Sequence, residues 1–366
     1  MTRVGARLLR RAATGLFVLV AMPTLTFCIY WAMPEEPGRF IYPFGFQTTR
    51  FELQDGARRL GADRPKLDQY ASWWWHLLHG SFGNQWGGAT LNDNRLIFSP
   101  IAPTLDPAIR ETLCLLVGGT LLVVLLAVPL GALAGRSVGS LSDRVISLLA
   151  LVGVCVHPIV SAKLLTTFVG AHARFIPAGG YCTFVRHAPP PPAPGQAAVA
   201  AVCGGPVDWF THLLLPWTSF ALLFLALYTR MIRASVAETV GEDFVRSARA
   251  KGASEARVLS RHVLPSAAPR VLTMVGMDIG TAIGVCVFVE YAYGFRGLGR
   301  LAVYAMAGDP FVGALDLPLL LAVVTVITAI IVLGNLAADT LFTVVDPRVR
   351  PSERAGRTKA IAAGVM

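Results

Sequence analysis

Charged side chains are scarce in this sequence: Asp, Glu, Lys and Arg make up 15% of its 366 residues, while hydrophobic residues make up 54%. Soluble domains carry about a quarter charged residues, so a chain this poor in charge is expected to lie in a membrane. The net charge of +10 does not indicate nucleic-acid binding, because the basic residues flank apolar runs and are not gathered on a polar face.

Several motifs of catalysis are also missing. The chain has no Gly-x-x-x-x-Gly-Lys-Ser/Thr loop, which would hold the phosphates of a nucleotide, and no His-Glu-x-x-His pair, which would bind zinc on a helix. No two cysteines have zinc-site spacing with histidines nearby. The sequence therefore predicts no catalytic residue, cofactor site or metal site in this chain.

Long apolar runs are abundant instead. A membrane-spanning helix needs about 20 predominantly apolar residues, and six stretches meet this requirement: residues 12–33, 112–135, 145–170, 212–232, 271–293 and 317–345. Backbone polar groups in lipid must be bonded within their own segment, so continuous runs predict helices and not the short alternating strands of a barrel. The sequence predicts an all-α membrane protein with about six transmembrane helices, forming a single membrane domain over residues 1–366. The first run is long enough to stay as a span instead of being removed as a signal peptide.

Lys and Arg are unevenly distributed between the loops. If the amino terminus is cytoplasmic, the loops on that side carry far more basic than acidic side chains, while the loops on the other side carry both in equal numbers. Basic loops remain in the cytoplasm, so both termini are expected there. Segment 34–111 and the Pro-rich insertion 182–205 are then extracytoplasmic, and the polar tail 351–366 is expected to be disordered.

Two of the six cysteines lie outside the predicted spans. Cys182 and Cys203 bracket the insertion 182–205 on the side where disulfides form. Two interpretations stay open: a disulfide that closes this loop, or two separate free thiols. The other cysteines lie in apolar runs and are expected to act as small packing residues.

Five ionisable side chains fall within or near the predicted spans: His157, Lys163, Asp278, Glu290 and Asp339. A charge in hydrocarbon costs at least about 2.5–3.5 kcal/mol, so each position needs an explanation. Glu290 is near the outer end of its span and is expected to reach water. Asp278 precedes Gly280 and Gly284 at small-xxx-small spacing, which predicts a structural hydrogen bond at a close helix contact. None of the five is predicted to bind substrate.

The cytoplasmic segment 241–265, GEDFVRSARAKGASEARVLSRHVLP, has the pattern of two short helices. Its acidic start favours one helix, which Gly252 ends in a left-handed conformation. Ser254 favours the start of a second helix, which Pro265 ends or bends. Helices this short need a partner surface, which predicts a rigid element that transmits displacement. The alternative is a pair of helices on the membrane surface with snorkelling arginines.

This segment resembles the cytoplasmic EAA loop of binding-protein-dependent ABC transporter permeases. In that family a glycine is followed at fixed distance by an apolar residue and Leu-Pro, as Gly252, Leu264 and Pro265 are here, and Ala248 matches the second alanine. Other pieces resemble the dipeptide and oligopeptide branch of the family: HGSFG at 79–83, RETL at 110–113, FIPAGGY at 175–181, YTRMIRASVAE at 228–238, GFRGLGRL at 294–301 and DPRVR at 346–350.

The resemblance implies a type I ABC importer permease fold in a bacterial inner membrane. It implies four kinds of partner: a second homologous permease subunit, two cytoplasmic ATPase subunits that bind ATP and Mg, an extracytoplasmic substrate-binding protein, and membrane lipid. The resemblance implies that ten residues couple this chain to the ATPases: Asp243, Phe244, Ala248, Lys251, Gly252, Ser254, Glu255, Val258, Leu264 and Pro265.

The function expected from the resemblance is import of dipeptides or oligopeptides, without catalysis by this chain. One alternative within the family is import of nickel or another small solute. Two alternatives come from other classes: an intramembrane enzyme such as a protease, for which the metal motif is missing, and a stand-alone carrier, which would not need segment 241–265.

Overall fold

The computed structural model describes residues 3–32, 49–92, 95–170, 172, 175–185, 203–307 and 315–345. Most of the insertion 182–205, the start of segment 34–111, the DPRVR motif and the tail 351–366 lie outside the described residues. The described chain is mainly helical, as predicted. Its long helices are α1 (Arg3–Ala32), α4 (Ala102–Arg136), α7 (Pro206–Val240), α10 (Leu264–Tyr293) and α12 (Leu317–Val345).

Among the described residues, five helices are long and apolar enough to cross a membrane. A sixth crossing is present if α5 (Leu141–Cys155) is counted together with α6 (Pro158–Leu165) and the π-helical turn that follows it, which form a bent pair. The six predicted spans are therefore present. The third is bent, as expected from His157 and Pro158: it is broken before Pro158, where the side chain of His157 accepts a hydrogen bond from the N–H of Ile159.

The chain forms two compact units. The first unit contains Met1–Val123, Val154–Phe224 and Thr281–Val332, and the second contains Val124–Gly153, Leu225–Gly280 and Leu333–Met366. The helices α4, α7, α10 and α12 contribute residues to both units.

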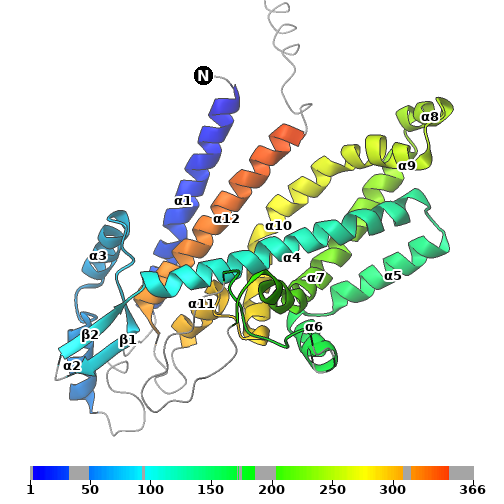
Figure 1. Ribbon diagram of the computed structural model, residues 1–366. Coiled ribbons are helices and arrows are strands. Elements are labelled where there is room, and N and C mark those ends of the chain that lie inside the picture. Colours follow the sequence, from blue (N-terminus) through cyan, green and yellow to red (C-terminus); the bar gives the residue numbers. More distant parts are fainter. Residues whose placement is uncertain are drawn as a thin grey trace, which may run out of the picture. The chain divides into compact units, whose positions relative to one another are not determined.

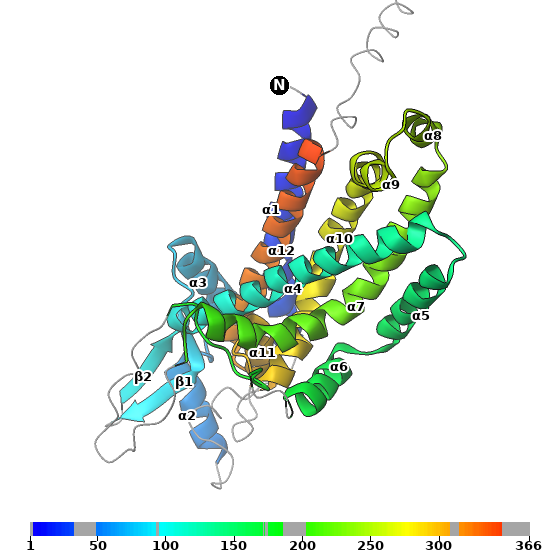
Figure 2. The ribbon, with the colours of Figure 1, turned by 45° about the vertical axis from the view of Figure 1, so that its right-hand side comes forward.

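The part of the first unit between α1 and α4 is more structured than the sequence indicated. It contains α2 (Arg50–Leu60), α3 (Lys66–Leu78) and an antiparallel pair of strands, β1 (Asn84–Asn92) and β2 (Arg95–Pro100), which lie beside α2 in both ribbon views (Figures 1 and 2). A capping box starts α2, in which the N–H of Thr49 donates to Glu52 at 2.7 Å and the N–H of Glu52 donates to the Thr49 hydroxyl.

A small aromatic core fixes this part of the unit to the spans. Its buried members come from α1, α2, the loop after α2, α3, β1 and α12: Phe27, Tyr30, Leu60, Ala62, Trp73, Trp86, Leu317 and Leu321. The consecutive tryptophans of α3 are divided, with Trp73 in this core and Trp75 64% exposed. Two short helices and one hairpin would not be stable alone. Burial of these aromatic side chains stabilises this part of the fold.

The expectation that Glu290 reaches water is wrong. Its side chain is fully buried in the first unit, where it accepts a hydrogen bond from the hydroxyl of Thr112 at 2.6 Å and others from the N–H groups of Gly299 and Arg300. These N–H groups open α11 (Leu298–Ala307), so the carboxylate caps that helix. A Cβ atom at Gly297 would overlap the carboxylate, which explains the glycine there.

The expectation of a close helix contact at Gly280 and Gly284 is also wrong within the described part of this chain. A Cβ atom at either position would meet nothing within 4 Å. Asp278 does accept the predicted kind of structural hydrogen bond, from Tyr228 in the second unit, and its other carboxylate oxygen has no partner. Both glycines are exposed.

Cys182 and Cys203 are joined in a disulfide, with Cα atoms 5.5 Å apart. The sulfur of Cys182 also lies 3.3 Å from Nε2 of His212. Of the cysteines expected to pack within the spans, Cys286 is buried, whereas Cys28 and Cys155 are exposed.

We predict that Glu290→Ala lowers the free energy of unfolding by about 3 kcal/mol or more, because each buried donor left without an acceptor costs about 1–3 kcal/mol. Thermal unfolding in detergent measures the effect. Glu290→Gln keeps one acceptor oxygen and should lose less. Asp63→Ala, at an exposed carboxylate, is the control, and equal unfolding temperatures for Glu290→Ala and Asp63→Ala would contradict the capping role.

Candidate functional site

The segment between α7 and α10 begins with the short helix α8 (Asp243–Ala250), which lies in the second unit next to the end of α7 (Figures 1 and 2). Asp243 in its first turn complements the positive end of the helix. Gly252 follows with φ +80°, and its N–H donates to the carbonyl of Arg249 while that of Ala253 donates to the carbonyl of Ala248. This is a Schellman ending, so the predicted glycine stop is confirmed.

An ion pair braces the turn that follows α8. The guanidinium of Arg249 donates two hydrogen bonds to the carboxylate of Glu255, at 2.8 and 3.1 Å. This contact raises the pKa of Arg249 above its ordinary value, because the carboxylate stabilises the charged guanidinium. Bidentate geometry fixes the direction of α9 (Glu255–Val258) relative to α8 more firmly than a single bond would.

The second predicted short helix is not separate. α9 continues through a π-helical turn, Leu259–Val263, directly into α10, so Pro265 neither ends nor interrupts it. Proline lacks the N–H that an α-helix would use, and the wider π turn just before it accommodates that loss. Ser254 stands at the N-cap position with extended backbone, but its side chain makes no capping hydrogen bond.

The ten residues expected to couple to the ATPase divide into two groups by exposure. Ala248 and Val258 are buried and Leu264 is half-buried, so they hold the segment to its own chain. The others are exposed: Asp243, Phe244, Lys251, Gly252, Ser254, Glu255 and Pro265. Phe244 is 46% exposed on a helix whose apolar face is otherwise inward.

Polar contacts hold the base of the segment. Arg270 in α10 donates to Glu238 of α7 at 2.5 Å and to the hydroxyl of Ser235 at 3.2 Å. Behind α9, a cavity of about 200 Å³ reaches to Ser137 in the loop after α4 and to Val240 of α7.

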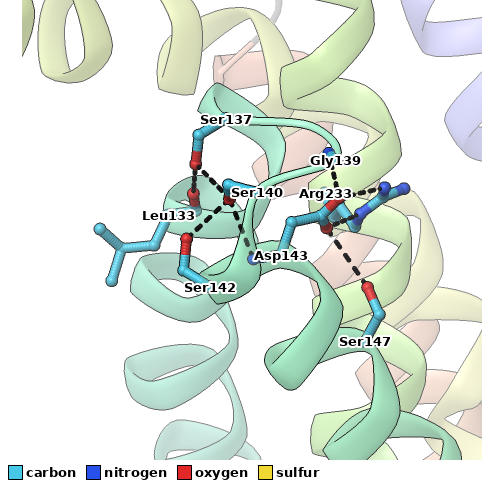
Figure 3. Close-up of polar contacts among 8 residues, drawn as sticks. All are labelled: Leu133, Ser137, Gly139, Ser140, Ser142, Asp143, Ser147 and Arg233. Atoms are coloured by element: carbon cyan, nitrogen blue, oxygen red, sulfur yellow. Dashed lines mark hydrogen bonds and ion pairs between the residues drawn. The ribbon is translucent and has the colours of Figure 1, made fainter.

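A buried carboxylate ties the loop between α4 and α5 to α7 in the same unit (Figure 3). Arg233 donates to both oxygens of Asp143, and the N–H of Gly139 donates at 2.8 Å. Ser147 donates to the same carboxylate at 3.3 Å, and Ser140 caps the start of α5 by accepting from the N–H of Asp143. The Asp143 side chain is 4% exposed, so this is a bidentate pair largely shielded from water.

Nothing in the sequence pattern predicts this pair. Hydropathy indicates where a loop lies, but it does not show which distant arginine forms an ion pair with the aspartate at that loop. A usable signal was Gly131 and Gly135, at small-xxx-small spacing. A Cβ atom at Gly135 would lie 2.6 Å from the carbonyl oxygen of Arg233, and one at Gly131 would lie 2.7 Å from Ile232, so these glycines allow α4 and α7 to approach closely.

Residues 135–139, Gly-Arg-Ser-Val-Gly, match the Gly-x-Ser-x-Gly spacing of a hydrolase nucleophile elbow. Such an elbow joins a strand to a helix and exposes the serine beside a base. Here the residues join α4 to α5, and the Ser137 hydroxyl donates to the carbonyl of Leu133 and accepts from Ser140 (Figure 3). The spacing therefore carries no support for an intramembrane enzyme.

Comparison with known proteins agrees with this arrangement. The chain is 28% identical over 349 residues to a probable peptide ABC transporter permease protein of Sinorhizobium fredii, covering 95% of this chain and all of that one. It is 28% identical over 348 residues to the dipeptide transport system permease protein DppB of Escherichia coli, covering 94% of this chain and 98% of that one.

Among solved structures, the MetNI methionine ABC transporter in an inward-facing form matches with a TM-score of 0.51 at 15% identity, over 68% of this chain and all of that one. This match confirms the expected type I ABC importer permease fold. Residues 4–90 match the N-terminal component of binding-protein-dependent transport systems, and residues 127–351 match their inner membrane component. The chain therefore belongs to the family of binding-protein-dependent transport system inner membrane components.

Proposed function

We propose that this protein is the permease subunit of an ATP-driven importer of dipeptides or oligopeptides, and that it forms half of the translocation path. The observation that carries the proposal is the braced segment between α7 and α10, whose second helix is continuous with a span. A stand-alone carrier has no need of such an element. The peptide substrate is inferred from relatives that are named peptide or dipeptide permeases and that match over nearly their whole length.

ATP and Mg are bound by two partner ATPase subunits, because this sequence has no phosphate-binding loop of its own. The exposed side chains of α8 and the following turn, Phe244 and Lys251 among them, contact the ATPases. Movement of the ATPases displaces α8, and the Arg249–Glu255 pair passes the displacement to α9. The π-helical turn joins α9 to α10, so the displacement reaches the span without an intervening loop.

One exposed face of α10 is available for the path or for the second permease subunit. It carries residues spaced three or four apart that the described chain leaves uncovered: Thr273, Met277, Gly280, Thr281, Gly284, Phe288 and Tyr291. Met277 is 79% exposed. Small and apolar side chains along one stripe allow a second helix to approach closely, which accounts for the two glycines that pack against no described residue of this chain.

Uptake by the complete transporter in liposomes tests the function. With the binding protein on the outward side and ATP on the ATPase side, we expect accumulation of labelled dipeptides. Accumulation of nickel chelates and not of peptides would show that the substrate is nickel, and would contradict peptide import. Solute entry that persists without ATPase subunits would contradict an ATP-driven importer.

We predict that Phe244→Ala weakens ATPase binding about tenfold, since truncating a buried aromatic at an interface typically costs more than 1 kcal/mol. Co-purification of ATPase subunits with the tagged chain measures it. The matched control is Phe51→Ala, an exposed phenylalanine of α2 on the opposite side of the membrane. Undiminished co-purification with Phe244→Ala would place the contact elsewhere.

We predict that Asp143→Asn leaves ATPase subunits bound but lowers transport per ATP hydrolysed, because α7 loses its ion pair to the α4–α5 loop. Unpairing a shielded ion pair costs about 1–4 kcal/mol when one partner keeps partial contact with water. Asp106→Asn, which breaks an exposed pair with Arg110, is the control. An unchanged ratio of transport to hydrolysis in Asp143→Asn would show that the pair has no part in coupling.

A further inference from the structure

The first unit contains a cavity of about 480 Å³ that the transport function does not use. It lies where the loop between α2 and α3 faces the start of β1 and the outward ends of α1 and α12. Its size falls within the range of small-molecule sites, about 300–1,000 Å³. Its lining is divided into an apolar part and a basic part.

The apolar part comes from the aromatic core. Phe27, Leu317 and Leu321 line the cavity from α1 and α12, and Trp73 and Trp86 line it from α3 and β1. Phe27 and Leu317 lie near the outward ends of membrane spans. The cavity therefore lies at the height where hydrocarbon gives way to headgroups.

The basic part carries three arginines from the end of α2 and the loop after it: Arg58, Arg59 and Arg64. Arg59 is neutralised by Asp55, at 2.7 Å. Arg58 and Arg64 are exposed, and no acidic side chain among the described residues forms an ion pair with either. Two guanidinium groups at the mouth of an apolar cavity favour an anion with a planar or tetrahedral set of oxygens.

A buried donor in the wall points to the same ligand chemistry. Trp73 is 7% exposed and lines the cavity, yet its indole N–H has no hydrogen-bond partner in the described part of the chain. Buried indole N–H groups normally donate to an acceptor, and leaving such a hydrogen bond unmade costs about 1–3 kcal/mol. A bound oxygen-rich group would supply this acceptor.

The surroundings favour a lipid over a soluble anion. Next to the cavity, α3 exposes Leu67, Trp75 and Leu78 on one face, at 69%, 64% and 76%. Such a face is stable in the headgroup layer and not in water. We propose that the cavity binds the headgroup of an anionic phospholipid from the outward leaflet. Arg58 and Arg64 pair with its phosphate, and its acyl chains follow Phe27 and Leu317.

The test is a titration of phosphatidylglycerol into the complete transporter in nanodiscs of phosphatidylcholine, with bound lipid counted by native mass spectrometry. We expect saturable binding of phosphatidylglycerol. Removing two cationic contacts in Arg58→Gln/Arg64→Gln should weaken it about tenfold or more. Trp73→Phe keeps the ring but loses the donor, and should weaken it about fivefold.

Arg50→Gln is the matched control, because Arg50 belongs to α2 but does not line the cavity, and it should bind lipid as the unaltered protein does. Equal unfolding temperatures in phosphatidylcholine show that the variants remain folded. Binding that is unchanged in the double arginine variant would overturn the proposal, as would equal binding of labelled phosphatidylcholine. Competition by glycerol phosphate as strong as that of lipid would also overturn it, by assigning the cavity to a soluble anion.

Discussion

The constraint on which the whole structure depends is that a backbone N–H or C=O group in hydrocarbon finds no water. Every crossing segment must therefore bond its own backbone, and the long apolar runs become helices. Several of the polar contacts that organise the fold lie where these helices begin, end or break. Asp143 with Arg233, Glu290 above α11, and the segment around Gly252 all lie at such places. The elements that these three groups of residues organise therefore lie at the ends of the spans.

Stiffness distinguishes the segment between α7 and α10 from an ordinary loop. A Schellman ending fixes the turn at Gly252, a bidentate ion pair fixes α9 against α8, and a π-helical turn carries the helix past Pro265 into α10. Each device replaces a flexible joint with a defined geometry. A displacement imposed on α8 therefore has few internal degrees of freedom in which to be lost, which is the physical requirement for a subunit that is driven by a separate motor.

The polar groups of the first unit serve two different ends. Glu290 is buried and both of its carboxylate oxygens accept hydrogen bonds, so it organises the start of α11. The arginine-rich cavity differs, because among the described residues it has two exposed guanidinium groups without an ion-pair partner and one buried indole N–H without an acceptor. Polar groups that are fully bonded stabilise a fold, whereas unsatisfied ones beside an open volume indicate a missing partner.

Hydropathy alone determined the six spans, because the bilayer imposes one length and one kind of backbone on every crossing. Local chemistry determined the helix end at Gly252, since only glycine adopts φ +80° without strain. The sequence could not place Asp143 against Arg233, 90 residues apart, nor bury Glu290 under α11, because these contacts depend on how helices pack and not on their own residues. It misassigned Gly280 and Gly284 for the same reason: spacing shows that a helix has a small-residue face, but only tertiary structure decides which neighbour, if any, covers that face.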